Sequence, residues 1–200
     1  MGEQKTPAAQ IARAIKDRDI DGLRRLLSDH PEQVASFTPI GAQTWVGYAA
    51  QVGNLPAVEL LAHVGADLSR GDERENSAPI CSAAFGNHQD VVTYLLKAGV
   101  PLDTSMSVRN PLFAAIVGRS SKIVRILLEA GIDSTVRYNS STMTDMDAVA
   151  FALMRGEREC AQIIALWNAK GAERAAETAL RAADQIAEVN AYGRRRKQKT

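Results

Sequence analysis

The sequence predicts an all-α solenoid, because a helix-turn-helix unit recurs along it at a nearly constant interval. The clearest unit is NSAPICSAAFGNHQDVVTYLLKAG, residues 76–99. A turn before Pro79 opens a short first helix, and Asn87 is suited to end that helix in the left-handed conformation. A second apolar helix then runs to Gly99. Two helices this short cannot bury their own apolar faces, so the unit needs neighbours of the same kind.

The same unit stands on both sides of this one. Gly53 lies 34 residues before Asn87 and Arg119 lies 32 residues after it, each at the end of a first helix. The second helices end, at the same spacings, in three glycines: Gly65, Gly99 and Gly131. A drifted later copy ends its first helix at Gly156, after a longer loop. The recurrence in phase predicts about five stacked repeats.

The repeats divide the chain into one array and a C-terminal extension. We expect the array to cover residues 1–172, with copies at about 8–31, 40–68, 74–102, 106–134 and 143–172. In residues 173–200, small apolar residues continue the spacing of three and four that Ala172 begins, namely Ala176, Ala179, Ala183 and Ile186. This stripe predicts a capping helix on the last repeat, or a helix that pairs with a partner, followed by a basic tail.

The recurring signatures resemble those of the ankyrin repeat. APIC at residues 78–81 and NPLF at 110–113 occupy the place of the turn signature T-P-L-H. The segments VVTYLLKAGV and IVRILLEAGI are similar to the second-helix signature, although the histidine of the turn signature is absent from every copy. The resemblance spans roughly residues 8–172. It implies an ankyrin solenoid that binds protein partners across its concave side, through loop tips and the exposed ends of the first helices.

Composition and charge exclude several other classes. No apolar run approaches the roughly 18 residues that cross a bilayer, and the N-terminus has no apolar signal segment. The formal net charge is +1, so a continuous basic face for nucleic acid is not expected. The basic run at 194–197 leaves nucleic-acid association as a less favoured alternative. Cys81 and Cys160 belong to repeats that are not neighbours and are expected to be buried, reduced thiols of a cytoplasmic protein.

The residue types that most often act in catalysis or metal binding are scattered along the sequence. His30, His63 and His88 lie in three different repeats and have no ligand spacing. Asp145 and Asp147 are close in sequence but have no acid partner or pocket, and the chain has no nucleophile elbow or phosphate-binding glycine loop. We therefore expect no enzyme, no small-molecule substrate, no cofactor and no metal.

The phase of the repeats locates the expected partner contacts. Apolar residues and arginines occupy positions that a regular repeat leaves exposed, and Phe85 is the expected anchor in copies three to five. The expected contact residues are Arg74, Glu75, Phe85, Met106, Arg109, Val117, Tyr138, Met143, Met146, Met154 and Arg155. The alternative is that irregular repeats bury some of these residues.

The later copies look similar to short bacterial ankyrin proteins, several of which neutralise a toxin or secreted effector. That likeness favours a stoichiometric binder or inhibitor of the immunity type, with one protein partner. A generic adaptor or scaffold protein is the alternative.

Overall fold

The computed structural model describes residues 6–39, 41–141 and 143–197, with side chains described as far as residue 191. The chain divides into two compact units, Met1–Pro101 and Leu102–Thr200. The described residues form helices, and their only strand-like pairs are two isolated antiparallel bridges, Phe37–Thr44 and Tyr138–Met146. The predicted all-helical repeat fold is confirmed.

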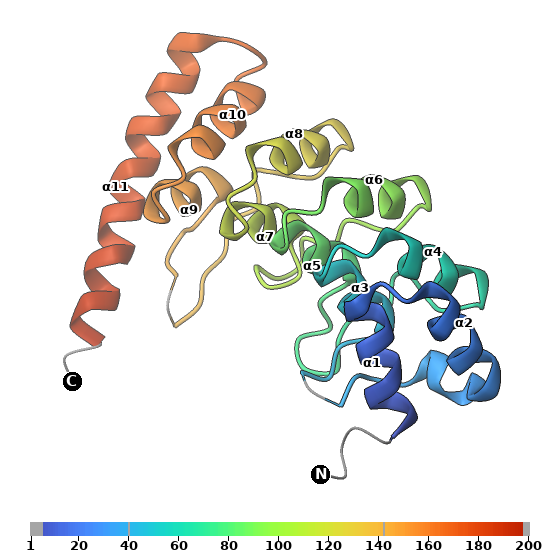
Figure 1. The fold of residues 1–200 in the computed structure, drawn as a ribbon. Helices are drawn as coiled ribbons and strands as arrows, with labels where there is room; N and C mark the ends of the chain where they lie inside the picture. Colours follow the sequence, from blue (N-terminus) through green and yellow to red (C-terminus); the bar gives the residue numbers. More distant parts are fainter. Residues whose placement is uncertain (1–5, 40, 142, 198–200) are drawn as a thin grey trace. The chain divides into compact units, whose positions relative to one another are not determined.

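The described part of the N-terminal unit contains three helix pairs and one short 3-10 helix. The pairs are α1 (Pro7–Asp17) with α2 (Ile20–Asp29), α3 (Trp45–Gln51) with α4 (Leu55–His63), and α5 (Pro79–Phe85) with α6 (Gln89–Lys97); the 3-10 helix is Pro31–Ala35. The first helices α1, α3 and α5 contact one another in sequence order, and so do the second helices α2, α4 and α6 (Figure 1). The unit is therefore two layers of helices, with its core between them.

The C-terminal unit repeats this arrangement and adds a long final helix. Its helices are α7 (Pro111–Val117), α8 (Ser121–Glu129), α9 (Ala148–Met154), α10 (Arg158–Asn168) and α11 (Glu173–Lys197). α7 packs against α9, α8 packs against α10, and α11 covers both α9 and α10. On α11, Ala176 and Ala183 of the expected stripe are buried, and Ala179 of the same stripe is exposed.

Left-handed residues end the first helices, as the sequence pattern indicates. Asn87 has φ 60°, and its counterparts have φ 66° at Gly53, 60° at Arg119 and 79° at Gly156. A positive φ at this point turns the chain back for the second helix and satisfies the last carbonyls of the first. Arg18 adopts φ 58° at the same place in the first pair.

Buried polar caps join neighbouring pairs. Asn54, which is fully buried, accepts a hydrogen bond from the Ala57 N–H with Oδ1 at 3.1 Å. Its Nδ2 donates to the Ile15 carbonyl of the preceding pair at 2.7 Å. One side chain therefore starts α4 and satisfies a buried carbonyl at the end of α1.

The core is aliphatic in both units. In the N-terminal unit, Ile15, Leu61 and Leu95 have no exposed surface. Trp45 is buried too, and its indole N–H donates to Ser36 Oγ at 3.0 Å, so the tryptophan is a packed core residue and not a contact residue. The fully buried aliphatic side chains of the C-terminal unit include Leu112, Ile116, Ile123, Leu127 and Leu128.

A charged turn follows three of the second helices. Asp67, Asp103 and Asp133 each accept hydrogen bonds from the backbone N–H and the side-chain hydroxyl of the residue two positions on. These hydrogen bonds lower the pKa of each carboxyl below its ordinary value of 3.8, and the bond from the hydroxyl has the largest effect. The turns are therefore most stable when the aspartates are ionised.

We expect Leu95→Ala to lower the free energy of unfolding by about 2–5 kcal/mol, because Leu95 is fully buried in α6 and its truncation leaves a cavity. Urea melts measure the change. Val189→Ala, on the exposed side of α11, is the control and should change stability by less than about 0.5 kcal/mol. A Leu95→Ala effect below about 1 kcal/mol would contradict the assigned core.

The aspartate turns predict a specific pH dependence. Because the folded pKa values are lowered, their stabilisation is present above the unfolded value and is lost as pH falls through the lower folded values. The variant that combines Ser69→Ala, Ser105→Ala and Thr135→Ala should be less stable than the parent at pH 7. The difference, measured by urea melts, should shrink below about pH 4. A difference independent of pH would show that ionisation is not involved.

Candidate functional site

The first helices present their last residues in equivalent positions. We call Gln51, Phe85, Val117 and Met154 the helix-end residues, because each is the last residue of its helix before a cap. Gln51 and Phe85 are exposed, and Val117 and Met154 are half-buried. Three of the four are apolar, which is unusual for positions that reach the surface.

Phe85 is followed by Gly86, which lies close to the preceding helix pair. A Cβ on Gly86 would lie 2.7 Å from the Gln51 carbonyl oxygen and 2.6 Å from the His88 ring. The His88 ring itself lies against that carbonyl, with Nε2 at 3.0 Å from the oxygen. The space beside Gly86 is thus taken by His88 and the end of α3, and the Phe85 side chain stays 51% exposed.

A well-ordered turn carries Arg74 and Glu75 ahead of α5. The Asp72 carboxylate accepts hydrogen bonds from the backbone N–H groups of Arg74 at 3.0 Å and Glu75 at 2.7 Å. The Glu73 N–H also donates to the Ala42 carbonyl at 3.0 Å. Both predicted contact side chains are exposed at the tip of this turn.

In the C-terminal unit, the loop before α7 presents apolar side chains to solvent. Met106 is 45% exposed, and Val108, which the sequence pattern did not single out, is 46% exposed. The Arg109 N–H donates to the Met106 carbonyl at 3.0 Å and closes the turn between them. Arg109 is half-buried, and its charge contributes to the lowered pKa of Asp103.

Tyr138 is buried, which makes its expected role as a surface contact wrong. Its ring meets Phe113 edge to face at a centroid distance of 5.0 Å. The hydroxyl donates to the Thr104 carbonyl at 2.7 Å and accepts from Asn110 Nδ2 at 2.9 Å. Burial raises the pKa of Tyr138 above its ordinary value. Tyr138 therefore anchors its loop to the base of α7.

Met146 is also buried, so its expected exposure is wrong as well. It pairs with Tyr138 through two backbone hydrogen bonds, at 2.9 and 3.0 Å, and its side chain has no exposed surface. The side chains of two directly opposite residues point to the same side, and both Met146 and Tyr138 are turned inward. Met143 stays half-buried, next to Thr144, whose backbone hydrogen-bonds with the Asn190 amide of α11.

The two aspartates of this loop have a structural partner. Arg137 Nη1 lies 2.6 Å from an Asp145 oxygen, and Arg137 Nη2 lies 3.0 Å from an Asp147 oxygen. Asp147 also caps α9 by accepting from the Ala150 N–H at 2.9 Å. One cation holding both carboxylates explains their proximity without catalysis. Arg155, the cap residue of α9, is exposed as predicted.

The described residues offer little for other chemistry. No group of three His, Cys, Asp or Glu among them could hold a metal ion. Cys81 and Cys160 are buried and form no disulfide, and burial, followed by the charges of Glu157 and Glu159, raises the pKa of Cys160 to about 11. Such a thiol stays protonated and is a poor nucleophile.

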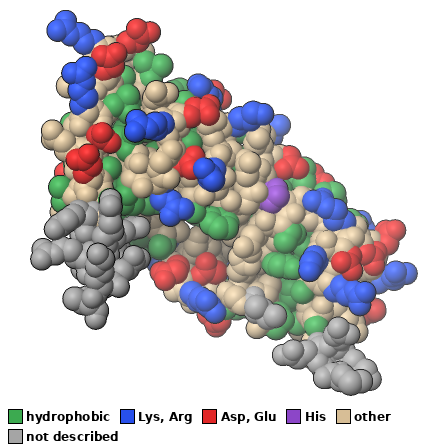
Figure 2. Space-filling model, turned by 60° about the vertical axis from the view of Figure 1, so that its left-hand side comes forward, with side chains coloured by type: hydrophobic (Ala, Val, Ile, Leu, Met, Phe, Trp, Pro, Cys, Tyr) green, Lys and Arg blue, Asp and Glu red, His purple; other side chains and the backbone are tan. Residues whose placement is uncertain are grey.

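The surface charge is mixed in sign. On the face in Figure 2, Lys and Arg side chains alternate with Asp and Glu, and hydrophobic side chains lie between them. The side chains of the basic run at 194–197 lie outside the described side chains, so nucleic-acid contact through that run stays a prediction. Within the described part of the chain, no helix is long and apolar enough to span a bilayer.

Comparison with known proteins agrees with the repeat architecture. Residues 46–138 match the family model described as ankyrin repeats (3 copies). The chain is 38% identical over 93 residues to Notch-regulated ankyrin repeat-containing protein A of Danio rerio, covering 45% of this chain and 81% of that protein. The human Notch-regulated ankyrin repeat-containing protein is 37% identical over 87 residues, covering 44% of this chain and 75% of that protein.

A much longer relative is matched over only a small part of its length. An ankyrin repeat and KH domain-containing protein of Caenorhabditis briggsae is 31% identical over 128 residues, which are 64% of this chain and 5% of that protein. The paired helices, the left-handed stops and these matches show that the chain belongs to the ankyrin-repeat family, whose members are protein–protein interaction modules and generally carry no enzymatic activity.

Proposed function

We propose that this chain is a stoichiometric binder of one protein partner, of the kind that inhibits a toxin or secreted effector. The observation that carries the proposal is Phe85, an aromatic residue at the end of α5 that is 51% exposed, while His88 and the Gln51 carbonyl occupy the space beside Gly86. Exposed aromatic residues on a rigid scaffold are typical centres of protein interfaces. Ordering such a surface on binding costs little entropy.

Polar residues near Phe85 in the sequence supply a rim in the N-terminal unit. Arg74 and Glu75 stand at the tip of the turn before α5, the helix that ends at Phe85. Their backbone is fixed by Asp72 while their side chains remain in solvent. An apolar centre with charged residues at its edge is the usual anatomy of an interface.

The C-terminal unit offers a second group of the same kind. Val117 and Met154 end α7 and α9, which pack against each other, so the two residues occupy equivalent places on adjacent helices. The other proposed contacts in this unit are Met106, Val108, Arg109, Met143 and Arg155. Methionine side chains adapt to the shape of a partner, which suits them to such a surface.

An inhibitor and an adaptor differ in how many partners they hold at once. An inhibitor needs one surface and a one-to-one complex that blocks the partner's activity, whereas an adaptor needs a second surface and leaves its partners active. We favour the inhibitor, and the number of bound partners and the activity of the captured partner decide between the two. The reduced, buried thiols of Cys81 and Cys160 support a cytoplasmic location, where cysteines stay reduced.

The test begins with capture of the partner on the immobilised chain, followed by calorimetric titration of the purified pair. We expect a one-to-one complex, loss of the partner's activity, and a weakening of about 2 kcal/mol or more for Phe85→Ala. Met154→Ala should weaken binding by a smaller amount. Val64→Ala is the matched control, because Val64 is an exposed apolar residue that follows a second helix, α4.

Stability measured on the same preparations separates binding from folding. Phe85→Ala should change the free energy of unfolding far less than Leu95→Ala does. Intact affinity in Phe85→Ala, or a loss of stability equal to that of Leu95→Ala, would overturn the proposed surface. A bound partner that keeps its full activity would favour the adaptor.

A further inference from the structure

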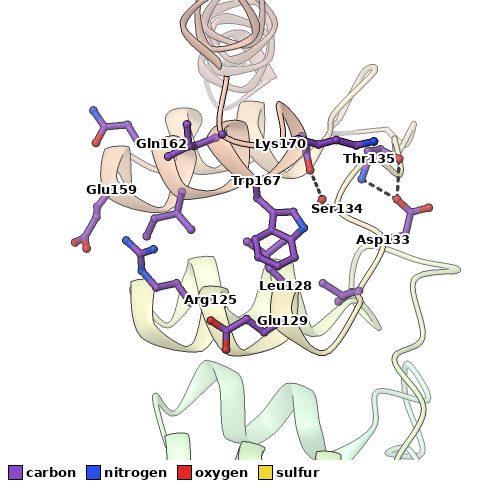
Figure 3. Close-up of a pocket in the computed structure, with 15 residues that line it drawn as sticks. Arg125, Leu128, Glu129, Asp133, Ser134, Thr135, Glu159, Gln162, Trp167 and Lys170 are labelled. Carbon is purple, nitrogen blue, oxygen red and sulfur yellow. Dashed lines mark hydrogen bonds between the residues drawn. The ribbon is translucent and has the colours of Figure 1, made fainter. Parts of the chain in front are cut away.

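The C-terminal unit contains an open groove on the side of its second helices. It lies along α8 and α10, has a volume of about 960 Å³, and is shown in Figure 3. Its apolar lining consists of Leu128 and Ile132 from the α8 side and Ile163, Leu166 and Trp167 from α10. None of these residues belongs to the proposed partner-binding surface, which is formed by the first helices and the loops.

Trp167 lies in this groove because α10 is longer than its counterparts. α4, α6 and α8 each have nine residues and α10 has eleven, so Trp167 and Asn168 extend it beyond the regular repeat. The Asn168 side chain is held by the Ser134 hydroxyl. Figure 3 shows the Trp167 ring reaching from α10 toward Leu128 and Glu129 of α8.

Trp167 is only partly packed in the described fold. It is 49% exposed, and Leu166 beside it is 41% exposed. Among the described residues, its indole N–H has no hydrogen-bond acceptor, whereas the indole of Trp45 donates to Ser36. A half-exposed aromatic face next to an exposed leucine is an unusual surface for an isolated soluble protein.

Glu129 and the carboxyl ends of α8 and α10 favour a cation beside Trp167, while Arg125 lines the groove one turn before Glu129. α8 and α10 both lack a basic residue in their last turn, so their partial negative ends are not neutralised from within. Glu129 lies below the Trp167 ring and forms no ion pair with any described residue, whereas Asp133 lies beside Thr135, with which it hydrogen-bonds. Lys170 lines the groove too, but Figure 3 shows its side chain running along the upper edge, toward Thr135 and away from the ring.

We propose that the α8–α10 groove binds a segment of a second protein that carries a lysine or arginine beside a large apolar residue. The cation lies on the face of Trp167 and faces Glu129, where the ring and the carboxylate both attract it. The apolar residue packs on Leu128 and Ile163. An acidic segment is disfavoured by Glu129 and by the two helix ends, and a purely apolar one leaves that carboxylate without a partner.

The test uses a phage-displayed library of random dodecapeptides, selected on the whole chain and counter-selected on Trp167→Ala. We expect the enriched peptides to carry Lys or Arg next to Leu, Ile, Met or Phe. An enriched peptide is then synthesised with a fluorescent label and titrated by anisotropy. Trp167→Ala should weaken its binding by more than about tenfold and Glu129→Gln by about three- to tenfold.

Controls separate this groove from folding and from the proposed partner surface. Glu59→Gln, on the exposed side of α4, and Phe85→Ala should leave peptide affinity unchanged, and urea melts should show that Trp167→Ala is folded. Acidic or purely apolar consensus peptides, no peptide dependent on Trp167, or self-association of the chain through Trp167 would each overturn the proposal. Loss of the proposed partner function would not affect these results.

Discussion

The structure depends on burial of apolar surface between helix pairs that are too short to be stable alone. First helices such as α3, with seven residues, and second helices such as α4, with nine, form few backbone hydrogen bonds. These bonds do not offset the conformational entropy that is lost when each helix nucleates. Each pair gains its stability by placing one face against the next pair, as α3 does between α1 and α5. Side chains such as Ile15 and Leu61 are fully buried in these layers, so the stability of any pair rests on its neighbours.

The same arrangement decides which residues remain for binding. The inner faces of the helices are buried against neighbouring helices, and the left-handed residue after each first helix determines where the chain turns back. The residue just before the turn then lies at the end of a rigid helix, exposed at Gln51 and Phe85 and half-buried at Val117 and Met154. At Phe85 the side chain is 51% exposed, and His88 and the α3 backbone occupy the space beside the next residue, Gly86. The helices of the repeat themselves place these residues at the surface, so no additional structural element is needed to present them.

The sequence predicted the features whose positions follow from the spacing of the repeats. The stops at Gly53, Asn87 and Arg119 recur in phase, and only a left-handed residue serves there, so spacing alone located them. Loops have no period, and the expectations for Tyr138 and Met146 failed for that reason. In that loop, burial is decided by long-range contacts, such as the Tyr138 hydroxyl with Thr104 and Asn110, which no local pattern reveals. The groove beside Trp167 was missed similarly, because it depends on two extra residues in α10.

The central claim is that a helix pair folds only against its neighbours, and a peptide of residues 76–99, which contains α5 and α6, tests it most directly. Circular dichroism of this peptide in dilute buffer should show a largely unfolded chain, while the whole protein under the same conditions shows a strong helical spectrum. Its helix content should not rise with peptide concentration in the micromolar range. A peptide that is as helical alone as the same residues are in the structure would show that the pair is stable by itself, and would contradict the account.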